Sequence, residues 1–473
     1  MTANSSNTDD HSLSPVPEGS RHGWLQLSWS TTGIVTTLIQ IFIGALVTFV
    51  AGIWMGVLAG ILVTIVGALL GWGVGHVAFK TGLASSMLAR QHGFGRRGSA
   101  VVALTFGFMI TGFIALENAL LYKGLLFWLN LDDTLWLQIV VYGVMTSVWI
   151  LLTAFGFELV SKVASYTLVA FLLLLGYMMF DVINASGQHW GDVLTFGAQF
   201  PEEVLVKMGA DTPMGKFGFC VNVLIGSAGA LALIDGDLGR YAKSSKDVLI
   251  AAVFGNVFMD IIMLVVGAVL MYAGTEQLVS YYVSRGVPHA EAVQAVLQSP
   301  DSVAAAFIVF GGSLGAILLF LAQGKAQVLN TYSSSLSLTN LFDVTIGWRP
   351  GRLTFVVLSN VIACLMLVGS ILDWVNGFIT ILGVLTTCFA GIIIADFFWV
   401  APRRAKGYIP EFNWPGLITV VVGFLLARYG FKPWIPIEFV SSLLSSFVLY
   451  PILSVLMNGK QVARQEARQG DGL

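Results

Sequence analysis

The sequence predicts an all-α polytopic membrane protein with twelve transmembrane helices, because apolar residues dominate it and occur in long stretches. Hydrophobic residues make up 56% of the 473 residues, charged residues 11%, and the mean hydropathy is +0.83. Soluble proteins carry about 25% charged residues. A helix needs about 20 apolar residues to cross a bilayer. Twelve such stretches lie near residues 29–53, 55–79, 99–128, 134–156, 159–183, 217–238, 248–273, 305–338, 353–372, 374–400, 414–431 and 436–456.

Basic residues are distributed unevenly, and their distribution predicts the orientation. With both termini in the cytoplasm, 17 of the 24 Lys and Arg residues lie inside. The other seven are Lys123, Lys207, Lys216, Arg285, Lys325, Arg428 and Lys432. Cytoplasmic loops of membrane proteins carry the excess of positive charge. We therefore expect a multi-pass protein of the cell (inner) membrane with two cytoplasmic tails, residues 1–28 and 457–473.

Two further features narrow the class of protein. The first 20 residues lack the basic and apolar regions of a signal peptide, so the first span is the expected insertion signal. The three cysteines, Cys220, Cys364 and Cys388, are odd in number and lack the spacing of metal ligands. We expect neither disulfides nor a metal site. The expected partners are the lipid bilayer and a small molecule, with no nucleic acid; the oligomeric state is not predicted.

The first span is unusually polar at its start, WSTTGIVTTLIQ. Its polar and small residues are Ser30, Thr31, Thr32, Gly33, Thr36, Thr37 and Gln40. Such residues favour either close helix packing or an opening of the backbone. The stretch 80–99 between the next two spans, KTGLASSMLARQHGFGRRGS, predicts a short interfacial helix and then a glycine turn. This helix would be a cytoplasmic gate or a topological anchor.

The stretch 226–241, GSAGALALIDGDLGRY, is the strongest candidate for a second broken helix. Each glycine in a helix interior costs about 1 kcal/mol relative to alanine. Unwound backbone at membrane depth is tolerated where it lines a cavity, and two interrupted spans in corresponding positions indicate inverted repeats around a central site. We expect repeats over 29–183 and 184–400, with 401–456 appended. The alternative is a cytoplasmic helix end at which Asp237 partners Arg240.

Glu117, Asp260 and Lys325 lie deep inside predicted spans, where charge is costly and marks a cavity, a proton site or an ion pair. Glu117 lies one helical turn after Phe113 and would occupy a cavity or pair with Lys325. Asp260 lies about 18 Å into its span at 1.5 Å per residue and is a candidate proton site or a paired group. Lys325 belongs to a polar face with Gln327 and faces the bundle, unless it snorkels to water. The span 305–338 is too long for one crossing, so its start is expected to be extracellular.

Several stretches in fixed order carry a resemblance to a known family. They are PVPEGSRHG at 15–23, KTGLASSMLAR at 80–90, FGRRGS at 94–99, GSAGALALIDGDLGRY at 226–241, TYSSSLSLTNL at 331–341 and GIIIADFF at 391–398. The chain resembles the nucleobase:cation symporter-1 family, the permeases for cytosine, purines, allantoin and hydantoins, and most of all its bacterial cytosine permeases. The resemblance implies a leucine-transporter-type fold with a five-plus-five inverted repeat, two appended helices and alternating access.

The resemblance also implies a substrate site. Family substrates are flat nitrogen heterocycles held between aromatic side chains of the third and sixth spans. Phe113 stands at the first aromatic position, with Glu117 at a polar position one turn on, whereas Ala228 stands at the second, so half of the sandwich is missing. Gln327 of the eighth span stands at an amide position, and Thr37 of the first span is a further substrate-binding candidate.

A second departure from the family concerns the coupling ion. Many members bind sodium through backbone carbonyls near Gly33 and Thr36 and two hydroxyl groups of the eighth span. Those hydroxyl positions are Lys325 and Ala326 here. A buried lysine can exchange its proton, so we expect coupling to protons rather than sodium, with Lys325, Gly33, Thr36 and Asp260 as ion-coupling residues and no organic cofactor.

These observations predict a secondary active transporter that imports a small nitrogenous heterocycle such as a nucleobase. The carboxyl group of Glu117 keeps open a permease for a cationic, guanidine-like or creatinine-like amine or a vitamin precursor, unless Glu117 is neutral or already paired. A channel is the alternative from another class, although no repeated filter segment is found. We expect no enzyme, since the chain has no HExxH, nucleophile elbow or phosphate loop.

Overall fold

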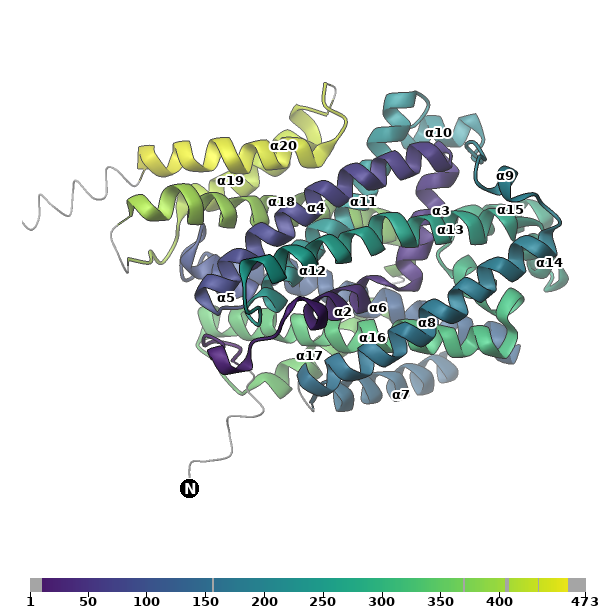
Figure 1. Cartoon of the computed structure of the whole chain (residues 1–473), viewed down its shortest axis with the longest axis horizontal. Helices are drawn as coiled ribbons and strands as arrows, with labels where there is room; N and C mark the ends of the chain where they lie inside the picture. Colours follow the sequence, from purple (N-terminus) through teal and green to yellow (C-terminus); the bar gives the residue numbers. More distant parts are fainter. Residues whose placement is uncertain (1–10, 155–156, 369–370, 405–407, 433, 458–473) are drawn as a thin grey trace, which may run out of the picture.

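The computed structural model describes residues 11–154, 157–368, 371–404, 408–432 and 434–457, and within them the chain is helical without a β-strand. The first ten residues of the predicted N-terminal tail and residues 458–473 of the predicted C-terminal tail lie outside this description. The long helices run side by side along the long axis of the molecule (Figure 1).

The helices have the following bounds. They are α2 Trp24–Val35, α3 Leu38–Ala51, α4 Ile53–Thr81, α5 Ser85–Gln91, α6 Ser99–Leu129, α7 Leu135–Ala154, α8 Phe157–Ser186, α9 Trp190–Val193, α10 Glu202–Met208, α11 Pro213–Gly239, α12 Ser245–Val257, α13 Met263–Ala273, α14 Thr275–Ser284, α15 His289–Gln298, α16 Asp301–Ile346, α17 Arg352–Val368, α18 Val375–Ala395, α19 Trp414–Leu425 and α20 Glu438–Leu444. A π-helical turn, Phe258–Ile262, joins α12 to α13. Similar turns follow α18, α19 and α20 at Asp396–Val400, Leu426–Gly430 and Ser445–Leu449.

The predicted all-α membrane architecture is confirmed. In the part of the chain that the structure describes, nine helices are long and apolar enough to cross a bilayer, or ten if the bent pair α2 and α3 is one span. Two further apolar helices, Arg352–Val368 and Trp414–Gly430, are shorter. Each of the twelve predicted stretches therefore coincides with helix, but the count of twelve crossings stays a prediction.

The first span is broken, as its polar sequence allowed. The helix α2 ends at Val35, α3 begins at Leu38, and their axes differ by 66°. The two residues between them have non-helical backbone, with φ −90° and ψ 71° at Thr36 and φ −128° and ψ 168° at Thr37. The break releases backbone groups that an unbroken helix would pair, and these groups need other partners.

The predicted break in the sixth span is wrong, since α11 is continuous from Pro213 to Gly239. Its glycines allow close helix packing instead. A Cβ added at Gly226 would come within 2.3 Å of Ile379 Cγ2 on α18, and one at Gly239 within 2.7 Å of the carbonyl oxygen of Gly75 on α4. Small residues at membrane helix interfaces let backbones approach closely. Here they hold α11 between α18 and α4.

The overlong eighth stretch is divided at Gly312, which has φ 52° and ψ −129°. The helix α16 bends at this residue, so its first turns from Asp301 form a segment separate from the long helix that follows. This agrees with the prediction that the start of the stretch does not cross the membrane with the rest. The longer part packs along α6, and α11 packs against α4 and α18.

The short helices lie at opposite ends of the bundle. Figure 1 shows α5 at one end and α9, α10, α14 and α15 at the other. The predicted short helix within 80–99 is present as α5, and the turn after it contains Gly93 and Gly95 with φ of 93° and 80°. Its place at the membrane interface stays a prediction. The loops predicted as cytoplasmic and extracellular thus lie at different ends. Which end faces the cytoplasm stays a prediction.

Candidate functional site

A cavity lies beside the break between α2 and α3. It contains about 340 Å³ of space that protein atoms do not fill, open solvent included, and α2, α3, α6, α11 and α16 line it together with the turn after α12. Its lining residues are Ile34, Val35, Gln40, Phe113, Glu117, Ser227, Ala230, Leu231, Ile234, Met259 and Asn330. The site is therefore mostly apolar, with four polar side chains that could orient a ligand.

Phe113 and Glu117 both line this cavity from α6, as their spacing of one helical turn predicted. The side chain of Glu117 is 2% exposed, and its Oε2 atom has no hydrogen-bond partner among the described residues. Thr37, at the helix break, lies close enough to interact with the Glu117 carboxyl group, although its hydroxyl has no well-aligned partner. The cavity thus contains a carboxyl oxygen that is free to accept a hydrogen bond from a ligand.

Gln40 and Ser227 connect the broken span to α11 across the cavity wall. Gln40 Nε2 donates to Ser227 Oγ at 3.1 Å. Neither residue was predicted as a site residue, and Asn330 and Met259 also line the cavity without having been predicted to do so. Gln40 and Asn330 could have been found as amides inside apolar stretches. Ser227 and Met259 carry no such signal, because small hydroxyl and thioether side chains are common in membrane helices.

Lys325 lies at the break itself. Its Nζ atom donates to the carbonyl oxygen of Thr36 at 2.5 Å and to that of Ala322 at 3.4 Å. The ammonium group also lies 4.2 Å from the ring centroid of Phe171 on α8. With 2% of the residue exposed, Lys325 does not snorkel to water. The lysine therefore supplies the donor that the freed carbonyl group of Thr36 needs.

Lys325 and Glu117 attract each other electrostatically but form no direct ion pair in the described part of the chain. The ammonium group is instead held by backbone oxygen atoms and an aromatic ring. The predicted alternative of a tight structural pair is therefore not what the structure contains. Gly33 and Thr36 were also predicted to take part in ion coupling. Gly33 lies buried in the last turn of α2.

Three predicted substrate contacts, Thr37, Ala228 and Gln327, are not among the residues that line the cavity. Ala228 is fully buried but faces α4, where a Cβ added at Gly67 would lie 3.1 Å from it. Gln327 donates to the carbonyl oxygen of Ile114 at 2.9 Å and to Asn118 Oδ1 at 2.7 Å. Both bonds fasten α16 to α6. In this conformation each points at a neighbouring helix, and a role of Ala228 and Gln327 in substrate binding stays a prediction.

Asp260, predicted for ion coupling, lies in the π-helical turn between α12 and α13 and is fully buried. Neither of its carboxyl oxygens has a hydrogen-bond partner among the described residues. It is outside the cavity lining, although its neighbour Met259 belongs to it. Asp260 therefore stands behind the cavity wall, on the side of α4.

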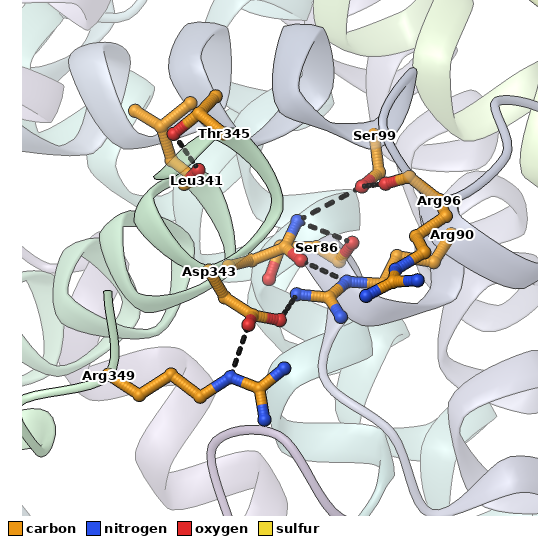
Figure 2. Close-up of polar contacts among 9 residues, drawn as sticks. Ser86, Arg90, Arg96, Ser99, Leu341, Asp343, Thr345 and Arg349 are labelled. Carbon is orange, nitrogen blue, oxygen red and sulfur yellow. Dashed lines mark hydrogen bonds and ion pairs between the residues drawn. The ribbon is translucent and has the colours of Figure 1, made fainter. Parts of the chain in front are cut away.

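At the opposite end from α9 and α10, the helix α5 joins α16 to α11. Arg90 of α5 forms an ion pair with Asp343 of α16 at 2.5 Å and a hydrogen bond with Asn340. Figure 2 shows Arg349 approaching Asp343 from the other side. The backbone N–H of Ser85 donates to Asp237 Oδ1 on α11 at 2.8 Å. We call these contacts the α5 clasp.

The predicted partnership of Asp237 with Arg240 takes another form. Arg240 Nε donates to the backbone carbonyl oxygen of Asp237 at 3.2 Å, and Arg240 Nη2 donates to the hydroxyl group of Tyr332 at 2.6 Å. Because Arg240 is fully buried, it fastens the end of α11 to α16 rather than lying at a water boundary. Together with the clasp, it closes this end of the bundle.

Three solved structures share this arrangement over nearly the whole chain. Mhp1, a nucleobase-cation-symport-1 family transporter, matches in a closed conformation with bromovinylhydantoin bound (TM-score 0.68, 17% identity, 94% of this chain and 94% of that chain). Its inward-facing conformation matches with TM-score 0.70, 18% identity, and coverage of 95% and 93%. A Na⁺-coupled sialic acid symporter matches with TM-score 0.60, 13% identity, and coverage of 95% and 93%.

The chain has the fold of a secondary transporter. The predicted leucine-transporter-type fold and the resemblance to nucleobase:cation symporters are thereby confirmed at the level of the fold. The nearer likeness to bacterial cytosine permeases is not. No protein-family model matches the chain, and no curated protein sequence does. At 13–18% identity the likeness extends to the fold alone.

Proposed function

We propose that the chain is a secondary active transporter that imports a small nitrogenous heterocycle, such as a nucleobase, by alternating access. The observation that carries the proposal is the cavity beside the broken span, in which an aromatic ring and a carboxyl oxygen without a partner face the same space. Transport rather than catalysis is proposed because the solved structures with this fold are transporters.

The lining residues suggest how a flat ring would bind. Phe113 offers one aromatic face for stacking, and the aliphatic side chains of Leu231 and Ile234 on α11 would contact the ring without a second aromatic partner. Glu117 Oε2 would accept a hydrogen bond from a ring N–H or an exocyclic amino group. The amide of Asn330 could bind the edge of the ring. A heterocycle with several donors fits this set best.

A cationic amine, including guanidine-like and creatinine-like compounds or a vitamin precursor, is the second candidate substrate. The specific observation in its favour is again Glu117, whose carboxyl group lies in the cavity without a direct cationic partner. A positively charged solute would supply that partner. A neutral heterocycle would instead have to donate a hydrogen bond to the same oxygen.

We further propose that protons, not sodium, drive transport. In the family that the sequence resembles, sodium is bound by carbonyl groups near the break in the first span. Here the ammonium group of Lys325 already binds the carbonyl oxygen of Thr36. A cation at that position would be repelled by the lysine and would lose a ligand to it. The α5 clasp would close the cytoplasmic end of the bundle. The protein would lie in the inner membrane with both termini inside, and its two repeats would cover residues 29–183 and 184–400.

Two measurements test the proposed function. Thermal unfolding of the purified chain with cytosine, hydantoin, creatinine and guanidine should show a rise in unfolding temperature for a true ligand, since binding to the folded state stabilises it. Uptake of that ligand into proteoliposomes should saturate and persist when choline replaces sodium. Strict sodium dependence would contradict proton coupling. A non-saturating leak current would favour the channel.

A variant separates the two substrate classes. Glu117→Gln removes the negative charge and keeps the shape of the side chain. It should abolish uptake of guanidine or another cation but spare a neutral heterocycle that can bond to the amide oxygen. Glu276→Gln on α14, an exposed position, is the matched control and should behave as wild type toward both.

A further inference from the structure

One face of α4 is formed by glycines, and polar atoms of α11 and α12 lie against it. Gly60, Gly67, Gly71 and Gly75 are spaced by seven, four and four residues, which places them on one side of the helix. A Cβ added at Gly67 would lie 2.0 Å from Asn256 Oδ1, and one at Gly71 would lie 2.1 Å from Asp235 Oδ2. These glycines are therefore required if the two polar side chains are to fit.

The groups that face α4 are buried and lack partners. Asp235 is 3% exposed, whereas Asn256 and Asp260 are fully buried. Asp235 Oδ2, Asn256 Oδ1 and both carboxyl oxygens of Asp260 have no hydrogen-bond partner among the described residues. Nearly all buried polar groups in proteins are hydrogen-bonded, so each exception needs an explanation. Asp235 and Asn256 meet glycines of α4 with these oxygen atoms, and Asp260 lies beside them with its backbone carbonyl group against Gly60.

Neither aspartate has a charged partner to neutralise it. A Cβ added at Gly71 would meet both Asp235 Oδ2 and the Cβ atom of Ala252 on α12, so both residues lie against this glycine. No charged group in the described chain acts on Asp235 or on Asp260. Asp237, two residues further along α11, is directed at Ser85 of α5 instead. An isolated carboxylate is very costly to bury, whereas a carboxyl group that can take up a proton is not.

The three groups follow one another along α4. Asp260 has its backbone against Gly60, Asn256 lies at Gly67 and Asp235 at Gly71. These glycines span 11 residues, which is about 16 Å of helix at 1.5 Å per residue. No group of three or more metal-binding side chains is found in the described chain. Their spacing suits a proton that moves in steps, with water between them.

We propose that Asp260, Asn256 and Asp235 form a proton file between α4, α11 and α12, separate from the substrate cavity. The inference rests on the proposed proton-coupled transport and adds the route. Ser227 and Ile234 of α11 face the cavity, while Asp235 faces α4. Substrate and proton would therefore pass along neighbouring faces of α11, since successive side chains of a helix are turned by about 100°. Each aspartate gains a proton from one side of the membrane and releases it toward the other, returning to the carboxylate.

Asn256 has a defined part in this file. Its Nδ2 donates to the carbonyl oxygen of Ala252 at 2.8 Å, which fixes the amide and leaves Oδ1 as an acceptor. The amide group of Asn256 would hold a water molecule between the two carboxyl groups without ionising.

At the other end of the interface, His76 Nδ1 of α4 lies 2.6 Å from Ser245 Oγ at the start of α12. His76 is the titratable group nearest along α4 after Gly71, and marks where the file would reach water.

The test uses the full chain in proteoliposomes and whichever of cytosine, hydantoin and creatinine is taken up. A pH-sensitive dye inside the vesicles reports proton influx driven by that solute. Asp235→Asn and Asp260→Asn should each lower proton influx about tenfold, within the usual range of thermodynamic coupling. Exchange of labelled solute across the membrane should persist, since the cavity is unchanged. Asp181→Asn, at an exposed position of α8, is the matched control.

A second measurement needs no substrate. The infrared difference spectrum between acidic and alkaline pH should contain the carbonyl band of a protonated carboxylic acid, which Asp235→Asn and Asp260→Asn reduce and Asp181→Asn does not. Gly71→Ala should also disturb the band, because the new methyl group displaces Asp235, whereas Gly143→Ala, which has open space around it, should not.

The outcomes distinguish the inference from the proposed function. If the wild type moves protons and both asparagine variants move them equally well, the file is wrong and proton coupling stands. If the wild type requires sodium and moves no protons, both are wrong. An unchanged carboxylic acid band in both variants would overturn the file in either case.

Discussion

The first and the sixth spans both combine glycines with polar residues, yet only the first is broken. Between α2 and α3 the backbone opens at Thr36 and Thr37, and neither residue is a glycine. The helix α11 contains glycines at 226, 229, 236 and 239 and remains helical throughout. Glycine content therefore does not decide where a membrane helix breaks in this chain.

The difference lies in what surrounds each helix. At the first span, Lys325 supplies a donor to the released carbonyl group of Thr36, in a medium where an unpaired group costs several kcal/mol. At α11, backbone and side-chain atoms of α18 and α4 occupy the space beside the glycines. An opened backbone there would lose close packing and gain no partner. A break needs a partner for the groups it frees, and glycine alone does not provide one.

The largest effect should come from removing that partner. Lys325→Met keeps the length of the side chain and removes the ammonium group, so the carbonyl oxygen of Thr36 loses its donor. Leaving a buried group unpaired costs about 1–3 kcal/mol, and uptake should fall by as much as about 100-fold if the free energy is lost from the transport-competent state. Initial uptake rates and thermal unfolding measure both effects. Lys207→Met, on the exposed end of α10, is the control. If Lys325→Met takes up the solute at the wild-type rate, the break needs no donor.

A large effect on stability is expected from Gly226→Ala. The added Cβ would lie 2.3 Å from Ile379 Cγ2 and 2.7 Å from the carbonyl oxygen of Ile379, so α11 and α18 must separate. Overpacking of this kind costs about 1–3 kcal/mol. Gly143→Ala on α7 meets nothing within 4 Å and should stabilise its helix by up to about 1 kcal/mol. The two unfolding temperatures should move in opposite directions; a rise for both would mean that α11 is not tightly packed.

How far the sequence predicted the site can be judged from the same two spans. A carboxylate in an apolar stretch is expensive and so points to a cavity, and Glu117 with Phe113 indeed lies in one. Ala228 was placed there by resemblance, yet its neighbour Ser227 lines the cavity instead. A shift of one residue turns a helical side chain by about 100°. Because apolar residues occur on every side of α11, its sequence does not indicate which face meets the cavity.

The fold was more predictable than the contacts, for a physical reason. Length and hydropathy place each helix, since the bilayer sets both, and the apolar stretches match the observed helices. Gln327 was expected to face a ligand but bonds to α6, because an amide inside a membrane bundle is satisfied equally well by a neighbouring helix. Burial of a polar group is readable from sequence, whereas its partner depends on packing between distant segments.

A smaller, local effect is expected at the α5 clasp, which ties the end of α11 to α16 and has no counterpart at the break. Arg90→Gln removes the ion pair with Asp343. Hydrogen bonds of charged groups contribute about 1.5–3 kcal/mol, so amide hydrogen exchange in α5 should become about tenfold faster or more. Arg96→Gln is the control, since Arg96 is 60% exposed and pairs only with Glu411 among the described acidic residues. Unchanged exchange in Arg90→Gln would mean that Ser85 alone holds α5 in place.

The smallest effect should come from the bond that joins the two spans directly. Ser227→Ala leaves Gln40 Nε2 without its acceptor at 3.1 Å, and one such hydrogen bond contributes about 0.5–1.5 kcal/mol. If the broken and the unbroken helix move together during transport, the loss should lower unfolding temperature slightly and leave the maximal uptake rate nearly unchanged. If they move apart, the bond must break in each cycle, and Ser227→Ala should raise that rate. Ser446→Ala controls for the loss of a buried hydroxyl group, because Ser446 Oγ donates to the carbonyl oxygens of Cys388 on α18 and Ser442 on α20. The direction of the rate change thus tells whether the bond between Gln40 and Ser227 persists or breaks during the transport cycle.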